Sequence, residues 1–339
     1  MTTIKDIAQQ AGVSVATVSR VINNLDSVTG ATKKKVMAVI AQSNYMPNFG
    51  GKLLRQSKSW NVLVSIPNVS DSFYSQILVG IEKALLAQGY QMIVAVSNYS
   101  ADSERKQMEM LTTRFVDGVI LTLPRMPNDE ITEYGKQYPI VLCASYLKNC
   151  ILPKVGIDYY RAAFEATEML IRHGHKRVAL ISRATNYSVQ NEDKKNGFID
   201  ALKRHNIDFD PSYYISVEEY ADNNSLVSAA ENGCRRLLQL PDPPTAFFSA
   251  TDYLAVGAVK ELLREGLSVG DKYEVVGFDN TELSELFVPS ITTIAQPRFE
   301  MGKSAANLLI EKINDPEAIN KSVILPHTIV LRNSTRPEK

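Results

Sequence analysis

The pattern of apolar positions changes once along the chain, near residue 60. Before it, apolar residues recur three and four positions apart in short segments, as at Val18, Val21 and Ile22, which is the spacing of an amphipathic helix. After it, short continuous apolar runs alternate with amphipathic segments. Such alternation is typical of βαβ units, whose parallel strands are buried on both faces. We therefore predict a small all-α N-terminal domain followed by a larger α/β domain, here called the body.

The first segment reads as two short helices around a turn. Thr3 is followed three residues later by Asp6, which predicts a capping box and a helix to about Ala11. Gly12 can adopt the positive φ of a turn, and Ser14 can cap the second helix. Two helices this short must pack together, and the spacing is typical of a helix-turn-helix. An ordinary helical hairpin at the edge of a domain is the alternative.

A helix-turn-helix places the start of its second helix in the major groove of DNA. Here that start is Val15, Ala16 and Thr17, with Arg20 one turn later. Arg20 can donate two hydrogen bonds to guanine, whereas Val15 and Ala16 offer only apolar contact, for instance to a thymine methyl. Much of the sequence specificity must therefore come from elsewhere.

Charge supports a nucleic-acid partner. Thr29 can cap a third helix over about residues 30–44, and Lys33, Lys34 and Lys35 near its start are expected to contact phosphates. Up to Lys58 the chain has eight lysines and arginines against two aspartates, while the whole chain has a net charge of zero. A basic segment joined to an acidic body is typical of a nucleic-acid reader carried by a different kind of domain.

The body is expected to form parallel sheets. Strands are predicted at residues 61–66, 91–96, 118–123, 140–143, 177–181, 246–249 and 274–278. Helices are predicted at residues 73–88, 103–114, 160–172, 189–205, 226–238, 254–264 and 297–313. This number of strands fits two sheets better than one.

Other features exclude several classes of protein. The N-terminus has no apolar signal region and no stretch is long enough to span a membrane, so a cytoplasmic location is expected. Cys143, Cys150 and Cys234 lack C-x-x-C spacing, which indicates neither disulfides nor a zinc site. His173 and His175 are interpreted as turn residues. Because enzyme motifs such as a phosphate-binding glycine loop, G-x-S-x-G and HExxH are absent, we expect no catalysis, no metal and no cofactor.

The helix-turn-helix, the sequence YMPN at residues 45–48 and the α/β body together resemble the LacI family of bacterial transcription repressors along essentially the whole chain. In that family, a hinge helix after Y-x-P-N inserts a leucine into the minor groove, which here would be Leu54. Such a wedge kinks DNA and reads its deformability; packing of Leu54 against its own domain is the alternative. The resemblance implies DNA contacts by Thr3, Ser14, Val15, Ala16, Thr17, Ser19, Arg20, Asn23, Thr29, Tyr45, Asn48 and Leu54.

The hinge departs from the family because it contains Gly50 and Gly51. Each glycine costs about 1 kcal/mol in a helix relative to alanine, or roughly 4 kcal/mol over two protomers. We therefore expect a hinge that is disordered without DNA. Replacing both glycines with alanine is expected to tighten operator binding.

For the body, the resemblance implies the fold of periplasmic sugar-binding proteins, in which two doubly wound lobes enclose a ligand cleft. The expected domains are a DNA-binding domain at 1–46, a hinge at 47–58 and the body at 59–339. Within the body, chain crossings near Tyr160, Thr292 and Asn320 would give a first lobe of about 60–159 and 293–320, and a second of about 160–292 and 321–336.

Open α/β sheets bind ligands beyond the carboxyl ends of their strands. Carried over residue by residue, the family pattern implies that a sugar or sugar phosphate contacts Phe73, Tyr74, Lys194, Tyr220, Thr251 and Asp279. Alternatives remain, since Phe73 also suits a core, Tyr220 a surface and Asp279 a turn. Asp252 is expected to cap the following helix.

Three positions depart from the family pattern, namely Lys194 for an arginine, Ala144 for an aspartate and Thr251 for an asparagine. They predict a mode of binding different from the usual sugar contacts. The combination is similar to catabolite control protein A, a member that responds to a phosphorylated carrier protein. That protein's partner-binding residues are replaced here by Phe299, Glu300 and Asn307.

Taken together, the sequence predicts a repressor of carbohydrate-related genes. It would bind a pseudo-palindromic DNA operator as a homodimer and would be gated allosterically by a small effector. One alternative is a regulator that responds to a protein partner, as catabolite control protein A does. The other is a sugar-binding receptor or sugar-converting enzyme without a DNA function.

Overall fold

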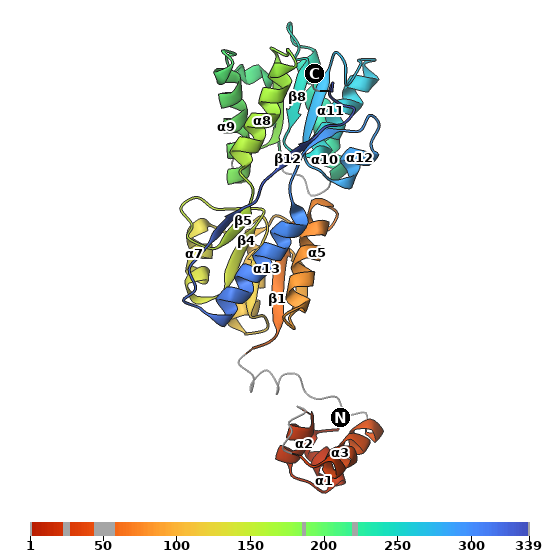
Figure 1. Ribbon diagram of the computed structural model, residues 1–339, viewed down its shortest axis with the longest axis vertical. Coiled ribbons are helices and arrows are strands. Elements are labelled where there is room, and N and C mark those ends of the chain that lie inside the picture. Colours follow the sequence, from red (N-terminus) through yellow and green to blue (C-terminus); the bar gives the residue numbers. More distant parts are fainter. Residues whose placement is uncertain (1, 23–27, 44–57, 185–187, 219–222, 338–339) are drawn as a thin grey trace. The chain divides into compact units, whose positions relative to one another are not determined.

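The computed structural model describes residues 2–22, 28–43, 58–184, 188–218 and 223–337 (Figure 1). The chain divides into two compact units, Met1–Ser59 and Trp60–Lys339. Within the described ranges, no helix has both the length and the apolar character that crossing a lipid bilayer requires.

The N-terminal unit contains α1 (Ile4–Ala11), α2 (Val15–Ile22) and α3 (Gly30–Gln42). The predicted capping box is confirmed, because the amide of Asp6 donates to Thr3 Oγ1 at 3.3 Å and the amide of Thr3 donates to Asp6 Oδ2 at 2.8 Å. Gly12 has φ 61°, as the turn requires. The three helices share a buried core of Ile7, Ala8, Ala11, Val18, Val21 and Val36. The predicted helix-turn-helix with a third helix is therefore confirmed.

The first lobe of the body is an all-parallel sheet in the order β11-β5-β4-β3-β1-β2. Its strands are β1 (Asn61–Ile66), β2 (Gln91–Val96), β3 (Gly118–Leu121), β4 (Ile140–Cys143), β5 (Lys154–Gly156) and β11 (Ser322–Ile324). Its helices are α5 (Phe73–Leu86), α6 (Ala101–Thr112), α7 (Asn128–Gln137) and α13 (Arg298–Asn314). Because side chains alternate along a strand, Val62 and Val64 of β1 pack in the core under α5 and α13, whereas Leu63 packs in the core under α6 and α7.

The second lobe repeats this plan with the strand order β12-β10-β9-β8-β6-β7, in which only β12 is antiparallel to its neighbour. Its strands are β6 (Val178–Arg183), β7 (Tyr214–Val217), β8 (Ala246–Ser249), β9 (Glu274–Asp279), β10 (Thr292–Ala295) and β12 (Thr328–Val330). The helices α8 (Tyr159–Arg172) and α9 (Val189–Arg204) cover one face, and α10 (Asn223–Leu238) and α11 (Asp252–Arg264) cover the other (Figure 1). The short α12 (Glu282–Leu286) follows β9. Two doubly wound sheets are thus confirmed.

The chain passes between the lobes after β5, between β10 and α13, and between β11 and β12. Two of the predicted crossings were therefore wrong by a few residues. The segment that starts at Thr292 pairs with β9 in the second sheet, and the segment that starts at Ser322 pairs with β5 in the first. Because each segment has only three or four residues, its sequence does not distinguish a strand that connects the lobes from a strand that pairs within a sheet.

The helices α5 and α13 lie side by side in the first lobe (Figure 1) and approach at two glycines. A Cβ atom on Gly80 of α5 would lie 2.1 Å from the carbonyl oxygen of Phe299, and one on Gly302 of α13 would lie 2.0 Å from that of Ile77. No side chain fits at either position, so the two helix backbones are in direct contact.

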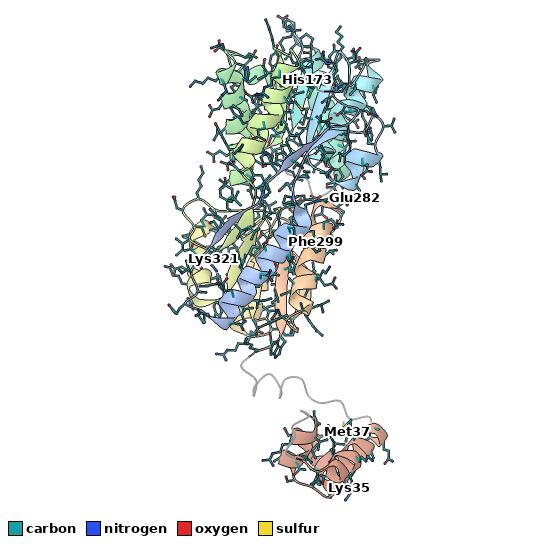
Figure 2. All side chains as sticks on the ribbon, viewed as in Figure 1. Lys35, Met37, His173, Glu282, Phe299 and Lys321 are labelled. Carbon is teal, nitrogen blue, oxygen red and sulfur yellow. The ribbon has the colours of Figure 1, made fainter. Side chains whose placement is uncertain are left out.

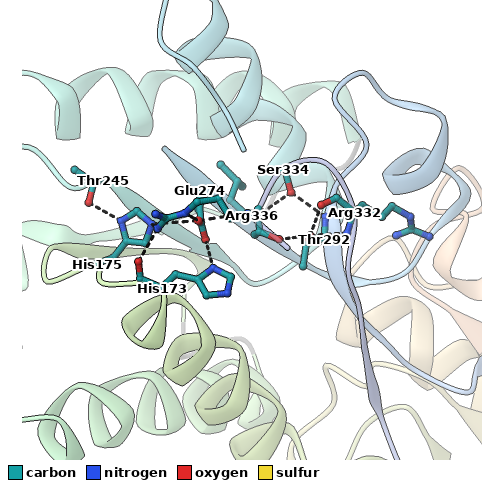
Figure 3. Close-up of polar contacts among 10 residues, drawn as sticks. His173, His175, Thr245, Glu274, Thr292, Arg332, Ser334 and Arg336 are labelled. Carbon is teal, nitrogen blue, oxygen red and sulfur yellow. Dashed lines mark hydrogen bonds and ion pairs between the residues drawn. The ribbon is translucent and has the colours of Figure 1, made fainter. Parts of the chain in front are cut away.

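At the end of the second lobe where β9 begins, a buried carboxylate connects the sheet to the C-terminal segment (Figure 3). Glu274 is fully buried and lies 2.7 Å from Nδ1 of His173, and Nε of Arg336 donates to it. His175 Nδ1 pairs with Thr245 Oγ1 at 2.8 Å. Burial alone would raise the pKa of Glu274, but hydrogen bonds from His175, Arg336 and His173 lower it to about 2. The two histidines are therefore more than turn residues, because they stabilise a buried charge.

Candidate functional site

One face of α2 is free of the core of the N-terminal unit. Val15, Ala16 and Arg20 are exposed, whereas Val18 and Val21 are buried. Among the other predicted DNA contacts, Thr3, Ser14 and Thr29 are exposed helix caps and Thr17 and Ser19 are half-buried. The remaining predicted contacts lie outside the described residues, namely Asn23, Tyr45, Asn48 and Leu54. The two hinge glycines, Gly50 and Gly51, also lie outside them.

A cavity of about 90 Å³ lies between the two lobes, at the carboxyl ends of the parallel strands. This is several times the ~10–15 Å³ that a single water molecule needs. Its lining combines aromatic, cationic and acidic side chains from both lobes, namely Asp71, Phe73, Tyr74, Leu123, Arg125, Ala144, Tyr159, Arg183, Ser188, Gln190, Asn191, Lys194, Thr251, Asp279 and Gln296. Of the predicted effector residues, Tyr220 lies outside the described residues and the others line this cavity; their contact with a ligand stays a prediction.

The aromatic part of the lining belongs to the start of α5. The ring centroids of Phe73 and Tyr74 lie 5.2 Å apart with an edge-to-face orientation, and both residues are also part of the hydrophobic core. Burial raises the pKa of the Tyr74 hydroxyl well above its usual value. Phe73 therefore packs in the core, as the alternative reading expected, and also lines the cavity, while its contact with a ligand stays a prediction.

The second lobe contributes two ionisable residues to the cavity lining, Lys194 and Asp279. The Lys194 amine donates to the carbonyl of Ala250 at 2.8 Å and lies 3.8 Å from the ring centroid of Phe278. Burial lowers the pKa of Lys194 and raises that of Asp279. Both groups are therefore less charged than on a surface, and the amine of Lys194 is already oriented by its own lobe.

The predicted capping role of Asp252 was wrong, because Thr251 caps α11 by accepting from the amide of Leu254. Asp252 instead accepts from the Thr281 amide at 2.6 Å and from the Thr293 hydroxyl at 2.6 Å. It is fully buried, and burial raises its pKa to about 6. Asp252 thus links α11 by hydrogen bonds to the loop that follows Asp279.

Two buried amides face the cavity with their acceptor oxygens unused. Gln190 donates through Nε2 to the Ala144 carbonyl at 3.0 Å, and Gln296 donates through Nε2 to Asp279 Oδ1 at 2.7 Å. These partners fix the orientation of each amide. In the part of the chain that the structure describes, neither Oε1 atom has a hydrogen-bond partner. Each of these buried oxygens therefore retains the capacity to accept a hydrogen bond.

Direct contacts join the lobes around the cavity. The carbonyl of Ala144 in the first lobe accepts from Gln190 and from the Tyr159 hydroxyl of the second, each at 3.0 Å. Lys148 of the first lobe pairs with Glu192 of α9 at 2.6 Å. The described arrangement is therefore one in which the lobes are closed on each other.

Arg298 makes a further contact between the lobes at the first residue of α13. Its guanidinium donates to the carbonyl of Ser72 in the first lobe at 3.1 Å and to that of Asn280 in the second at 2.9 Å. It also lies 3.6 Å from Glu282, and Figure 2 shows Glu282 of α12 near Phe299 of α13. Because Ser72 precedes Phe73 and Asn280 follows Asp279, Arg298 joins two segments that line the cavity.

Sequence reasoning missed several lining residues. Asp71, Arg125 and Arg183 stand at or just beyond the carboxyl ends of β1, β3 and β6. The rule that ligands bind beyond these ends was the available signal. Gln190 and Gln296 had no such signal, since one lies inside a helix and the other in a connection between lobes.

Comparisons with known proteins agree with this architecture. The family model described as bacterial regulatory proteins, lacI family, matches residues 3–48, and that of the periplasmic binding protein-like domain matches residues 167–335. The solved structure of a complex of the transcriptional regulator CelR with cellobiose has a TM-score of 0.72 at 27% identity, covering 98% of this chain and 100% of that one.

Curated relatives match over nearly their full length. The HTH-type transcriptional repressor CytR of Escherichia coli K12 is 33% identical over 335 residues, covering 98% of this chain and 96% of CytR. Catabolite control protein A of Priestia megaterium is 34% identical over 336 residues, covering 98% of this chain and 99% of that protein. These relatives are transcriptional regulators and not enzymes. The chain therefore belongs to the lacI family of bacterial regulatory proteins, the DNA-binding transcriptional repressors that its helix-turn-helix and its two-lobed body indicate.

Proposed function

We propose that this repressor binds a pseudo-palindromic operator as a homodimer and that a small sugar-like effector in the cavity between the lobes gates this binding. The observation that carries the proposal is the cavity itself. It lies between lobes in direct contact, and its lining includes Gln190 and Gln296, whose buried Oε1 atoms have no hydrogen-bond partner among the described residues.

The chemistry of the cavity suits a polyhydroxylated ligand. Sugars present hydroxyl groups on their edges and apolar C–H groups on their faces, and aromatic side chains such as Phe73 and Tyr74 pack against those faces. The CelR structure, which contains cellobiose, supports a sugar-like ligand for this fold. We therefore assign Phe73, Tyr74, Lys194, Tyr220, Thr251 and Asp279 to effector binding, together with Gln190 and Gln296.

On DNA, the exposed face of α2 would enter the major groove and the residues around it would contact phosphates. A palindromic operator requires two such helices, hence two protomers. Val79 and Leu86 of α5 and Val94 of the edge strand β2 are exposed apolar residues. They offer a surface that a second copy of the chain would cover.

Gating would follow from the two-lobed body. An effector that prefers one lobe arrangement shifts the population towards it, and operator affinity changes by the difference between the two arrangements. By linkage, the operator changes effector affinity by the same factor.

The decisive experiment is footprinting of the purified protein on the DNA upstream of its own gene, repeated with a panel of sugars and sugar phosphates. A protected pseudo-palindrome that is lost or gained with one ligand is the expected result. Protection that does not change with any ligand would support the DNA-binding function and indicate regulation by a protein partner instead. The absence of any protected pseudo-palindrome, with or without a ligand, would contradict the proposed operator binding in this region.

Replacing Arg298 with methionine is expected to loosen the closed lobes. The variant loses hydrogen bonds from a charged donor to Ser72 and Asn280, each worth roughly 1.5–3 kcal/mol. Amide hydrogen exchange in residues 67–72 and 280–282 is expected to accelerate by roughly 10- to 100-fold. Arg298→Lys should restore part of the protection, and Arg172→Met, at an exposed arginine, should leave it unchanged. Equal protection in Arg298→Met and the parent protein would show that Arg298 does not hold the lobes.

A further inference from the structure

The turn at the end of β9 has an unusual backbone conformation. Asp279 has φ 107° and Asn280 has φ 51°. Asparagine enters the left-handed region more readily than most residues, but φ 107° lies beyond that region and is rare for any residue except glycine. A conformation of this kind persists only where its surroundings hold it, and it is most frequent at ligand sites and in segments that switch. The contacts that hold this turn therefore bear on its role.

Hydrogen bonds from three other elements hold the backbone of this turn. The amide of Asn280 donates to Thr293 Oγ1 of β10 at 3.3 Å. The carbonyl of Asn280 accepts from Arg298 of α13 at 2.9 Å. The next amide, that of Thr281, donates to Asp252 of α11 at 2.6 Å. The backbone is therefore restrained on both sides of Asn280.

The side chain of Asn280 is held by Arg332 of the C-terminal segment. Nη2 of Arg332 donates to Asn280 Oδ1 at 2.8 Å. Nη1 of the same guanidinium donates to the carbonyl of Ile291 at 3.0 Å and to Ser284 Oγ at 3.2 Å. The amide of Arg332 donates to Thr292 Oγ1 at 2.8 Å (Figure 3). The guanidinium is therefore oriented by its own surroundings as well as by Asn280.

Arg332 is not among the residues that line the cavity, whereas Asp279 is. The carboxyl of Asp279 accepts from Gln296 Nε2 at 2.7 Å. Because Asp279 and Asn280 share one peptide group, a rotation of that group changes ψ of the first residue and φ of the second together. Arg332 can thus influence the position of the Asp279 carboxyl through this shared peptide group.

We propose that Arg332 is a positioning residue of the effector site: it holds Asn280 in its left-handed conformation and thereby fixes the carboxyl of Asp279 in the cavity. This inference rests on the proposed effector binding by Asp279 and adds to it a residue that lies outside the cavity. Without Arg332 the turn relaxes, and Asp279 becomes more exposed to water. Because a group that is already in place need not be ordered when the ligand arrives, the loss of Arg332 lowers effector affinity.

The titration of Asp279 reports on its position without any effector. Carbon-13 NMR of the full-length protein, labelled at its aspartate carboxyl carbons, follows each aspartate with pH, and Asp279→Asn identifies the signal. In the parent protein, burial and the nearby carboxyls of Asp252 and Asp71 raise the pKa of Asp279. The positive charge of Lys194 acts in the opposite direction.

Arg332→Met is expected to lower the pKa of Asp279, because the released carboxyl is better hydrated. The acid dissociation constant of Asp279 should rise roughly tenfold or more. The loss of a positive charge alone would change the pKa in the opposite direction, so a fall in the pKa reports a change of position. Asn280→Ala removes the same hydrogen bond from the other side and is expected to give the same fall, which keeps the test open if Arg332→Met does not fold.

Two further variants test whether Arg332 acts through Asn280. Arg332→Lys keeps a cation but cannot donate to all three acceptors, so a smaller fall is expected. Asn280→Gly should keep Asp279 in place, because glycine adopts a positive φ at little cost. When Asn280→Gly is already present, adding Arg332→Met is expected to leave the pKa of Asp279 nearly unchanged.

A loss of stability alone would not give this result. Glu274 and Asp279 stand at opposite ends of β9. Glu274→Ala is expected to destabilise the same lobe while leaving the pKa of Asp279 unchanged. Urea unfolding of each variant verifies that the body is folded under the conditions of the titration.

Two results of the titration would overturn the inference. One is an unchanged or raised pKa of Asp279 in folded Arg332→Met. The other is an equal fall on adding Arg332→Met with and without Asn280→Gly, because Arg332 would then act by a route other than Asn280.

Footprinting with the panel of sugars separates this inference from the proposed gating. A sugar that changes the footprint of the parent protein should be needed at a concentration roughly 10-fold higher or more with Arg332→Met. If that sugar acts equally on both proteins although the pKa has fallen, Asp279 is not an effector contact and the inference fails while the gating stands. If no sugar changes the parent footprint, the gating fails, and the titration still decides whether Arg332 positions Asp279.

Discussion

Replacing Arg20 with alanine is expected to weaken operator binding by roughly 30-fold to 10⁴-fold. Arg20 is exposed one turn into α2, and a bidentate contact to guanine is worth about 1–3 kcal/mol in each half-site, so two half-sites double the loss. Binding of the purified protein to its footprinted operator, measured by fluorescence anisotropy, gives this factor.

The dependence of the lost affinity on DNA sequence identifies the kind of contact that Arg20 makes. Arg20→Ala should relax discrimination at one guanine in each half-site. Lys33→Ala, at an exposed lysine of α3, should weaken binding to all sequences alike and reduce the salt dependence, as expected for a phosphate contact. If the two variants lost affinity without regard to sequence, Arg20 would be a phosphate contact and not a base reader.

Replacing Glu274 with alanine is expected to lower the free energy of unfolding of the body by about 1–3 kcal/mol, because the mostly buried rings of His173 and His175 lose the carboxylate that they pair with. His173, His175 and Arg336 all converge on this carboxylate (Figure 3). Urea unfolding followed by Trp60 fluorescence or circular dichroism measures the change. Glu300→Gln, at an exposed carboxylate of α13, should change stability by no more than about 0.5 kcal/mol.

The same carboxylate predicts how stability depends on pH. The pKa of Glu274 is lowered from 4.5 to about 2 in the folded protein. A lowered pKa stabilises the fold above the unfolded value, and that contribution is lost as the pH falls through the folded value. The parent protein should therefore lose stability between about pH 4.5 and pH 2 more steeply than Glu274→Gln. Parallel pH profiles of the two proteins would contradict this role.

The main elements of the fold could be predicted because their signals are local. Long amphipathic segments such as α8 and α13 can be recognised as helices from a short stretch of sequence, and apolar runs such as β1 can be recognised as strands. The elements that were missed are short or polar, namely β5, β7, β10, β11, β12, α7 and α12. A strand of three residues such as Lys154–Gly156 forms because neighbouring strands offer hydrogen bonds, which no local pattern reveals.

The candidate site was predictable to the extent that its residues follow strands. Phe73 begins the helix that follows β1, Asp279 ends β9, and both could be placed on that ground together with the family resemblance. Arg125 and Arg183 belong to different lobes, yet both line the cavity. Their common position depends on the relative placement of two sheets, which the order of residues does not specify.

The close backbone approach at Gly80 and at Gly302 packs α5 and α13 together along their lengths. A helix of 14 residues such as α5 is roughly 21 Å long. Phe73 stands at its cavity end, and Tyr90, just beyond its other end, has its ring centroid 5.0 Å from that of Trp60. A rigid tilt of roughly 3° about its cavity end would displace the far end of a helix of this length by about 1 Å. Such a tilt would therefore be felt at Trp60, the first residue of the body.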